Sequence, residues 1–445
     1  MPEKILIGSE FIETANTKQV VNPYTNKSVG EVFIAGEKEF EDSLTYLEKA
    51  FKTYSKTPTY VKQELLYNIS AAVNSQKESL ARLITDETGK PIKFSRIEVE
   101  RAVLTFRLGA EECSRIYGEV LPLDLLKGSE NKTGIVRRFP IGIILGITPW
   151  NFPINLAAHK ISPALAAGNV ILIKPSSSSM LTALALGRII YDECIKLGIK
   201  EIPVNVIPIA GSAMDRHVAD SRIKLISFTG SGDVGWGIKK KSDRQKVSLE
   251  LGGNAGVIVN HDADIASAAA KIAIGGFAQA GQSCISVQRV YVHESIYENF
   301  RTKLLDETAK LKFGDPYNDD TAIGPMITTE EAERAEKWIT EAKCAGAVIL
   351  TGGNRNGAVL EPTVIENAPD HVNVKCAEVF APVITIEKFS GFEEAVEKVN
   401  NSRYGLQAGI FTNSMSNIMY AYNTLHTGGV IVNEASAYRM DAMPY

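Results

Sequence analysis

From Ile141 onward the chain alternates short apolar runs with longer stretches of helical periodicity. The runs rich in Ile, Leu and Val are Ile141–Ile147, Val170–Ile173, Val204–Ile209, Lys224–Phe228 and Val247–Leu251. Helix-like segments such as Asn155–Ala167 and Leu181–Leu197 separate them. Strands that are apolar along their length and alternate with helices are typical of a parallel, doubly wound sheet.

In sheets of this kind, ligands bind at the carboxyl ends of the strands. The polar residues that follow the apolar runs therefore indicate where a site would lie. They are Pro149-Trp150-Asn151, Lys174-Pro175-Ser176, Thr229-Gly230-Ser231 and Glu250.

The rest of the chain shows three further patterns. From Gly36 to Tyr117 apolar residues recur at helical spacing, and Leu121–Arg138 is typical of a protruding hairpin. A second α/β stretch follows Gly253, and at 445 residues the chain is too long for one core, so two or three domains are expected. In the stretch after Gly253 the expected strands are Ala255–Val259, Ser286–Val292 and Val348–Leu350. The expected helices there are Ala263–Ala280, Ser295–Leu311 and Thr329–Ala345, and Asp262 or Asp264 would cap the first of them.

Composition excludes several classes of protein. The net charge is -4 and the only basic run, Lys239–Lys241, is short, so neither nucleic acid nor an anionic membrane is an expected partner. The uncharged stretch between Arg138 and His159 contains three prolines, which argues against a membrane span. Five scattered cysteines and six histidines without ligand spacing favour no disulfide framework and no metal site. With no signal peptide at the N-terminus, a cytoplasmic protein is expected.

Three residues could carry covalent chemistry, although each also has an ordinary structural interpretation. Cys284 follows a helix and a Gly-containing turn, where a backbone amide can point at an oxyanion, but a lone cysteine is more often an inert core residue. Glu250 ends an apolar strand and could be a general base or a paired structural carboxylate. Asn151 could donate a hydrogen bond from its side-chain amide to an oxyanion, or it could be a structural residue of the turn.

Two further segments could hold a phosphorylated ligand. Lys174 is followed by Pro175 and four serines, a combination that can bind ribose or phosphate oxygens at a strand end. Residues 230–235 read Gly-Ser-Gly-Asp-Val-Gly before a helix, which fits the spacing of a dinucleotide-binding turn. That spacing alone is weak support, because glycine-rich turns are common.

Taken in order, these segments resemble the aldehyde dehydrogenase superfamily, and the resemblance runs from near the N-terminus to the last residue. The chain is similar at 147–153 (Ile-Thr-Pro-Trp-Asn-Phe-Pro), 163–169, 173–176, 228–231, 249–253 (Leu-Glu-Leu-Gly-Gly), 281–284 (Gly-Gln-Ser-Cys), 378–382 (Glu-Val-Phe-Ala-Pro), 404–406 and 411–412. The resemblance implies an α/β fold with a Rossmann-type cofactor domain (1–120 and 139–250), an α/β catalytic domain (251–430) and an oligomerisation element (121–138 and 431–445). It also implies a homodimer or homotetramer.

The resemblance assigns roles by position. Cys284 would be the nucleophile, Glu250 the base, and Asn151 with the Cys284 amide the oxyanion hole. Lys174 and Glu378 would hold ribose hydroxyls, while other members of the set contact the nicotinamide and pyrophosphate of NAD or NADP. The full set of expected cofactor residues is Thr148, Pro149, Trp150, Lys174, Ser176, Ser177, Gly211, Phe228, Thr229, Gly230, Ser231, Leu251, Gly252, Glu378 and Phe380. In this family the 230–235 glycines do not act as the usual dinucleotide fingerprint.

Departures from the family pattern bear on the ligands. Ser177 replaces a glutamate that in NAD-preferring members repels a 2′-phosphate, so NADP should be tolerated. Asp215 occupies a position that is often glycine in this family, and it is expected to alter the adenine pocket modestly. For the substrate, the candidate residues are His159, Arg107, Ser283 and Arg439. The similarity at 150–160 and 438–444 to lactaldehyde and glyceraldehyde dehydrogenases favours a small hydroxylated or acidic aldehyde, of the lactaldehyde, glyceraldehyde or succinic semialdehyde type.

Three alternatives remain open at this point. Family chains continue past Tyr445, so a truncated, catalytically silent dinucleotide-binding homologue is one of them. A coenzyme A-acylating dehydrogenase is the second, although Glu250 argues against it because that branch does not need activated water. A thiol-redox role for Cys284 is the third, with no second cysteine near it in the sequence.

Overall fold

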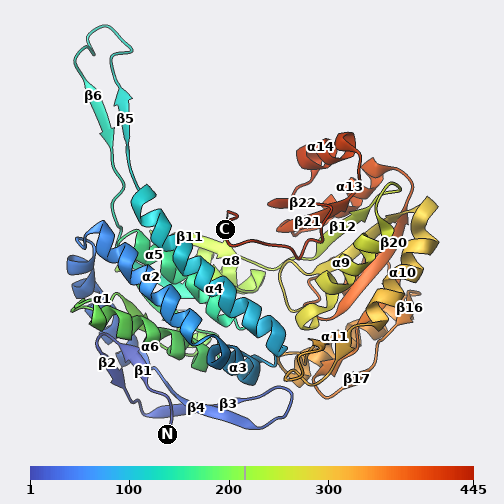
Figure 1. Ribbon diagram of the computed structural model, residues 1–445, viewed down its shortest axis with the longest axis horizontal. Coiled ribbons are helices and arrows are strands. Elements are labelled where there is room, and N and C mark those ends of the chain that lie inside the picture. The colour runs from blue at the N-terminus through green and yellow to red at the C-terminus, as the bar shows by residue number, and fades with distance from the viewer. Residues whose placement is uncertain (215–216, 445) are drawn as a thin grey trace.

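Two seven-stranded sheets organise the described part of the chain, one in each of two lobes (Figure 1). The structure is a computed structural model that describes residues 1–214 and 217–444, so Asp215 and Tyr445 lie outside the described residues. One apolar core is built from residues between Ile5 and Ile238, and the cores of the other lobe lie between Val257 and Ala435. The division of cores agrees with a change of lobe near residue 250, while the exact domain boundaries stay a prediction.

The first sheet contains the strands expected from the apolar runs. Its order is β11-β10-β7-β8-β9-β1-β2, and the first five of these strands are parallel. The predicted parallel, doubly wound sheet is confirmed, with β7 buried along its whole length. Its strands are β7 (Ile143–Ile147), β8 (Val170–Lys174), β9 (Val204–Val206), β10 (Ile223–Thr229) and β11 (Lys246–Glu250), and its helices are α5 (Pro153–Ala166), α6 (Met180–Lys196), α7 (Gly211–Met214) and α8 (Gly232–Lys241).

The N-terminal part combines predicted helices with strands that the sequence did not reveal. The helical pattern of Gly36–Tyr117 is confirmed as α1 (Glu37–Tyr54), α2 (Thr59–Ser75), α3 (Lys77–Thr88), α4 (Ile92–Glu112) and the short turn Cys113–Arg115. Before them lie β1 (Ile5–Ile7), β2 (Glu10–Ile12), β3 (Asn16–Val21) and β4 (Ser28–Ile34). These strands are short or mostly exposed, so they carry no long apolar pattern.

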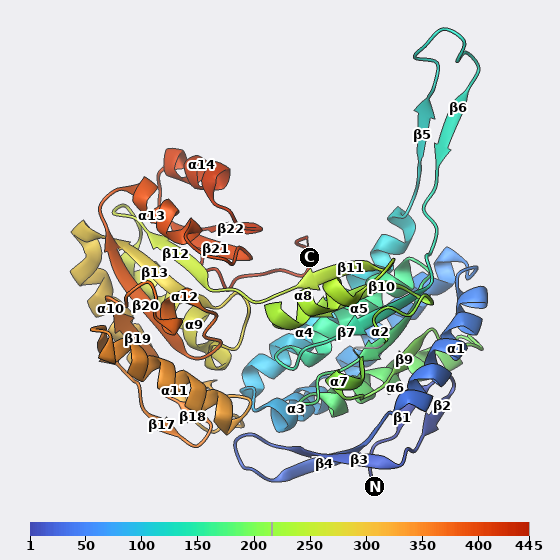
Figure 2. The ribbon, with the colours of Figure 1, turned by 180° about the vertical axis from the view of Figure 1, so that it is seen from behind.

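The second sheet has the order β16-β19-β20-β13-β12-β21-β22 and is parallel except for the β16–β19 pair (Figure 2). The three predicted strands appear in it, and Asp264 caps α9 by accepting a hydrogen bond from the Ser267 amide. Its strands are β12 (Ala255–Val259), β13 (Val287–His293), β16 (Val348–Thr351), β19 (Thr363–Glu366), β20 (Val383–Phe389), β21 (Gln407–Phe411) and β22 (Gly429–Val432). Its helices are α9 (Ile265–Phe277), α10 (Tyr297–Ala309), α11 (Thr329–Cys344), α12 (Asn373–Cys376), α13 (Phe392–Asn400) and α14 (Met415–Thr424); the minor pairs are β14 (Lys312–Phe313) with β15 (Thr321–Ile323) and β17 (Arg355–Asn356) with β18 (Val359–Leu360), and two single turns span Ala278–Gly281 and Glu294–Ile296.

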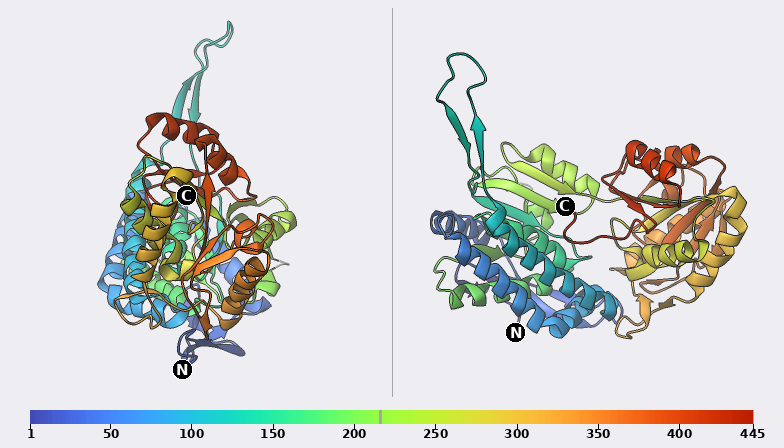
Figure 3. Two further views of the ribbon diagram at one scale, coloured as in Figure 1. Left: turned by 90° about the vertical axis from the view of Figure 1, so that its right-hand side faces the viewer. Right: turned by 45° about the horizontal axis from the view of Figure 1, so that its top comes forward.

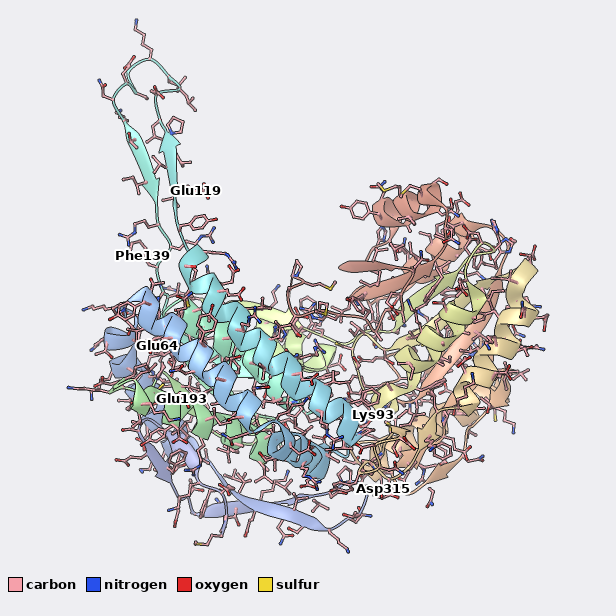
Figure 4. The ribbon with its side chains drawn as sticks, in the orientation of Figure 1. Glu64, Lys93, Glu119, Phe139, Glu193 and Asp315 are labelled. Carbon is pink, nitrogen blue, oxygen red and sulfur yellow. The ribbon has the colours of Figure 1, made fainter. Side chains whose placement is uncertain are left out.

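A two-stranded hairpin projects from the end of α4, away from both lobes. It consists of β5 (Glu119–Pro122) and β6 (Thr133–Val136), and Glu119 and Phe139 mark its base in Figure 4. The hairpin predicted at Leu121–Arg138 is thus present, with pairing that begins slightly earlier. Several of its apolar side chains are exposed, including Val120, Leu125, Leu126 and Ile135.

The lobes meet at the start of α4 and again through the C-terminal segment. The Ile92 amide donates to the Pro316 carbonyl at 2.8 Å, and Lys93 Nζ donates to the Asp320 carbonyl at 3.1 Å. Figure 4 labels Lys93 and Asp315 in the region where the lobes meet. Residues 433–444 leave β22 and run back between the lobes (Figure 3). No helix in the described residues is both long and apolar enough to span a membrane.

Candidate active site

A cavity of about 830 Å³ lies between the lobes at the carboxyl ends of β7, β10 and β11. The first lobe contributes the turn after β7, including Asn151, and the end of β11, Glu250. The second lobe contributes Cys284 and Phe380. The strand-end rule therefore pointed to the correct edge of the sheet, and the structure brings the three expected reacting residues to one cavity.

The turn that carries Cys284 is strained and heavily hydrogen-bonded. Gln279 and Ala280 both have φ of +56°, a left-handed conformation that costs a non-glycine residue about 1 kcal/mol or more. Gly281 continues this conformation, and a Cβ there would lie 2.2 Å from the Ala381 carbonyl. The Gln282 side chain accepts from the Ile327 amide at 2.9 Å and donates to the Gln279 carbonyl at 3.3 Å. Such bonds hold the turn in a conformation that its own backbone disfavours.

Asn151 is tied to this turn in both directions. Its Nδ2 donates to the Gln282 carbonyl at 3.0 Å, and the Gln279 side chain donates to the Asn151 carbonyl at 2.7 Å. A primary amide has two N–H donors, so one remains for a group bound in the cavity. The geometry fixes the amide beside Cys284, as an oxyanion-binding residue requires.

The electrostatics around Cys284 disfavour its thiolate. Burial raises the pKa of the Cys284 thiol to about 12, and the nearby carboxylates of Glu378 and Glu250 act in the same direction, while Arg439 opposes them. The thiol is therefore protonated at neutral pH, and its activation requires a base or an added positive charge nearby.

Lys160 is a buried cation beside Glu250 that the sequence analysis missed. Its Nζ donates to Thr229 Oγ1 at 2.8 Å and to Ser227 Oγ at 3.1 Å. Burial lowers the pKa of Lys160 to about 7, against the opposing effect of the Glu250 carboxylate. Glu250 thus lies close enough to influence both the nucleophile and a titrating lysine.

The remaining cavity wall fits a dinucleotide. A Cβ on Gly252 would lie 2.1 Å from the Glu378 carboxylate, which accepts from the Gly253 amide at 2.9 Å. Trp150 and Phe380 pack edge to face at 5.7 Å and form an apolar part of the cavity wall. Ser231 is the N-cap of α8, so a positive helix terminus, which favours phosphate, opens onto the cavity.

The expected cofactor residues fall into two groups. Those that line the cavity are Pro149, Trp150, Thr229, Gly230, Ser231, Leu251, Gly252, Glu378 and Phe380. Thr148, Lys174, Ser176, Ser177, Gly211 and Phe228 do not line it, and lie at or just after strand ends of the same sheet or at the start of α7. Burial lowers the pKa of Lys174, and the charge of Lys18 on β3 lowers it further, so two cations lie at this end of the sheet.

The substrate candidates are divided in the same way. His159, Ser283 and Arg439 line the cavity. Arg107 does not, because it lies on the outer face of α4, largely exposed and paired with Glu111 at 3.1 Å. The structure instead places Arg101 on the cavity wall. Six residues of helix turn the side chain by about 240°, so only one of these two arginines can face the cavity.

In residues 1–214 and 217–444 no group of three His, Cys, Asp or Glu side chains is arranged to hold a metal ion.

Comparison with known proteins gives the family. Residues 11–445 match the aldehyde dehydrogenase family along nearly the whole chain. The chain belongs to this family. It is an NAD(P)-dependent aldehyde dehydrogenase, and the resemblance and the fold class inferred from the sequence are both confirmed.

Relatives of this aldehyde dehydrogenase are similar over most of their length. A 3-sulfolactaldehyde dehydrogenase from Priestia aryabhattai is 40% identical over 443 residues, covering 99% of this chain and 91% of the relative. A lactaldehyde dehydrogenase from Methanococcus aeolicus is 35% identical over 445 residues, covering 99% and 93%. The crystal structure of aldehyde dehydrogenase 21 from Physcomitrella patens, in complex with the reaction product succinate, matches with a TM-score of 0.96 at 40% identity, covering 100% of this chain and 93% of that one. The glyceraldehyde-3-phosphate dehydrogenase GapN from Methanocaldococcus jannaschii, complexed with NADP, matches with a TM-score of 0.92 at 36% identity, covering 97% and 93%.

Proposed function

We propose that this enzyme oxidises a small aldehyde carrying a hydroxyl or acidic group to its carboxylate, through a thioester on Cys284. One observation carries the proposal: Cys284, Glu250 and Asn151 line a single cavity together with the guanidinium groups of Arg101 and Arg439. Arginine binds carboxylate, sulfonate and phosphate groups through charge-assisted hydrogen bonds. Relatives named for lactaldehyde, 3-sulfolactaldehyde and aspartate semialdehyde, and a neighbour holding succinate, support this substrate class.

In the first step of the proposed mechanism the Cys284 thiol passes its proton through Glu250 to solvent and becomes a thiolate. Its sulfur attacks the aldehyde carbon, and the oxyanion that forms accepts hydrogen bonds from the second N–H of the Asn151 side chain and from the Cys284 amide. Each such donor stabilises the transition state by about 3 kcal/mol. When bound, NAD or NADP supplies the hydride acceptor that converts the adduct to a thioester.

Glu250 would complete the reaction as the general base. It takes a proton from a water molecule that attacks the thioester carbon, so the carboxylate leaves and Cys284 is regenerated. The sum is aldehyde, oxidised cofactor and water giving carboxylate, reduced cofactor and two protons. The proximity of Glu250 to both the Cys284 thiol and Lys160 supports this role.

The cofactor roles remain those implied by family membership. We propose that Lys174 and Glu378 hold ribose hydroxyls, that Phe380 contacts the nicotinamide, and that Ser231 faces the pyrophosphate. Ser177 leaves room for a 2′-phosphate, and the positive charge of Lys18 near Lys174 favours one. We therefore expect NADP to be used at least as well as NAD.

The domain and partner assignments are likewise proposals. Residues 1–120 with 139–250 would form the cofactor domain and 251–430 the catalytic domain. The element formed by 121–138 and 431–445 would join subunits into a homodimer or homotetramer. The exposed apolar side chains of the β5–β6 hairpin support this, because such surface is normally covered by a partner.

A panel assay tests the proposed function. Reduced cofactor is followed by absorbance with lactaldehyde, glyceraldehyde, succinic semialdehyde and propanal, each with NAD and with NADP, beside the Cys284→Ala variant. We expect turnover that disappears in the variant and favours the three functionalised aldehydes over propanal. Preference for propanal would contradict the substrate class, and product formation that requires coenzyme A would favour the acylating alternative.

A further inference from the structure

The C-terminal segment that returns between the lobes (Figure 3) carries Asp441. The Asp441 side chain bonds to three residues that are distant in the sequence and line the cavity, Arg101, Asn155 and His159. Its carboxylate accepts from Arg101 Nε at 3.0 Å and Arg101 Nη2 at 2.9 Å. It also accepts from Asn155 Nδ2 at 3.1 Å and lies 2.8 Å from His159 Nε2. The partners come from α4 and α5, so the cluster fastens the C-terminal segment to the other lobe.

The carboxylate is a permanent buried anion. Its side chain is 1% exposed. Burial alone would raise the pKa of Asp441, but hydrogen bonds from His159 and Arg101 hold it well below the usual range. A buried charge of this kind is tolerated only while its partners stay in place, because removing one leaves the charge uncompensated. The cluster therefore anchors the C-terminal segment to α4 and α5.

Asp441 bonds to one edge of the Arg101 guanidinium and leaves the other edge, which carries Nη1, for another group. Nε and Nη2 make a bidentate pair with Asp441, which fixes the plane of the group. Nη1 makes no hydrogen bond within the described residues, and Arg101 lines the same cavity as Cys284. Arg101 also lies 5.9 Å from the ring of Phe152, which directly follows Asn151. The unused edge is thus held in place for a ligand within reach of the reacting residues.

The same anchor fixes a second cation. Arg439 lies two residues before Asp441 on the segment and lines the cavity. Cys284 lines the same cavity, and the positive charge of Arg439 lowers the pKa of the Cys284 thiol against the effect of burial. Holding Asp441 against α4 and α5 therefore also holds Arg439 on the cavity wall.

We propose that Asp441 is a positioning residue that sets the preference of the enzyme for aldehydes with an anionic distal group, by orienting Arg101 and the segment that carries Arg439. The inference rests on the proposed function and adds to it the origin of the preference. A carboxylate, sulfonate or phosphate would bind the edge of Arg101 that Asp441 leaves unused. Asp441 itself touches no reacting atom.

The test compares a matched pair of substrates in five proteins. Succinic semialdehyde and butanal share a four-carbon chain, and only the first carries a charge. The ratio of their kcat/KM values is measured for the wild type, Asp441→Asn, Asp441→Glu and Arg101→Met, together with the double variant Asp441→Asn/Arg101→Met. Melting temperature and cofactor affinity are recorded for each protein.

We expect Asp441→Asn to lower the ratio by about tenfold or more, through KM for the anionic substrate, while kcat for butanal changes by less than about threefold. Asp441→Glu should restore part of the ratio. Asp441→Asn should lower the ratio less in the Arg101→Met background than in the wild type, because the part of its effect that passes through Arg101 is already lost there.

Other outcomes overturn the inference. If Asp441→Asn lowered kcat/KM equally for succinic semialdehyde and butanal, Asp441 would have a merely structural role. If the variant raised the ratio of the two kcat/KM values, Asp441 would compete with the substrate for Arg101. A wild-type preference that survives Asp441→Asn would refute this inference alone. A wild-type ratio near one would refute the proposed acidic substrate, and the inference with it.

Discussion

Replacing Asn151 by alanine tests whether its amide stabilises the transition state. In the resting structure one Nδ2 hydrogen is used by the Gln282 carbonyl at 3.0 Å, so a single donor remains for the oxyanion. Loss of one such donor lowers kcat by about 10²–10³-fold, or about 3–4 kcal/mol. KM should change little, because the oxyanion exists only after attack by Cys284.

The assay is steady-state formation of reduced cofactor with the best aldehyde of the panel, at saturating cofactor. Asn151→Asp is the matched variant, since it keeps the shape of the side chain and removes the N–H donors. It should lose at least as much activity as Asn151→Ala. Breaking the bond to Gln282 should cost only about 1 kcal/mol of stability, measured by denaturant unfolding. A fall in kcat of less than about tenfold with intact folding would refute the assignment of Asn151 to the oxyanion hole.

Three further predictions concern charge and assembly. Since burial lowers the pKa of Lys160 to about 7, the unfolded state binds more protons between pH 7 and 10.5, so stability should rise with pH across that range. Lys160→Met removes this titration. Relative to the wild type, its free energy of unfolding in urea should therefore rise by on the order of 4 kcal/mol as the pH falls from 10 to 7. A difference between the two proteins that does not depend on pH would contradict this prediction. Ser177→Glu should lower kcat/KM for NADP by about tenfold or more and leave that for NAD within about threefold, and equal losses would argue against a 2′-phosphate near Ser177. Ile135→Asp, on the exposed hairpin, should dissociate the proposed oligomer and lower the mass measured by light scattering. An unchanged mass would show that the hairpin is not part of the interface.

Much of the site could be predicted from the sequence because the first sheet is parallel. Once the apolar runs are assigned to parallel strands, Asn151, Thr229 and Glu250 must share one edge, and they do. The nucleophile turn was placed correctly after its helix. The left-handed backbone at Gln279 and Ala280 was not predicted, since tertiary hydrogen bonds, and not local preference, hold it there.

What could not be predicted depends on contacts between distant parts of the chain. Arg107 was expected at the substrate site but does not line the cavity, and Arg101, which does, was not considered. The helix pattern does not tell which face of α4 meets the cavity. His159 lines the cavity, as expected for a substrate residue, but its pairing with Asp441 could not be predicted, because the two residues lie 282 positions apart and only the fold brings them together. Lys160 was overlooked since a lysine within an apolar helix has no sequence signal for its buried partners.

The central claim is a thioester on Cys284 that water activated by Glu250 hydrolyses. The most direct measurement is the mass of the Glu250→Gln variant after incubation with aldehyde and oxidised cofactor, followed by peptide mapping. The account predicts a burst of about one reduced cofactor per site and an acyl group on the peptide containing Cys284, because attack proceeds and hydrolysis stalls. Turnover at the wild-type rate, with neither burst nor adduct, would contradict it.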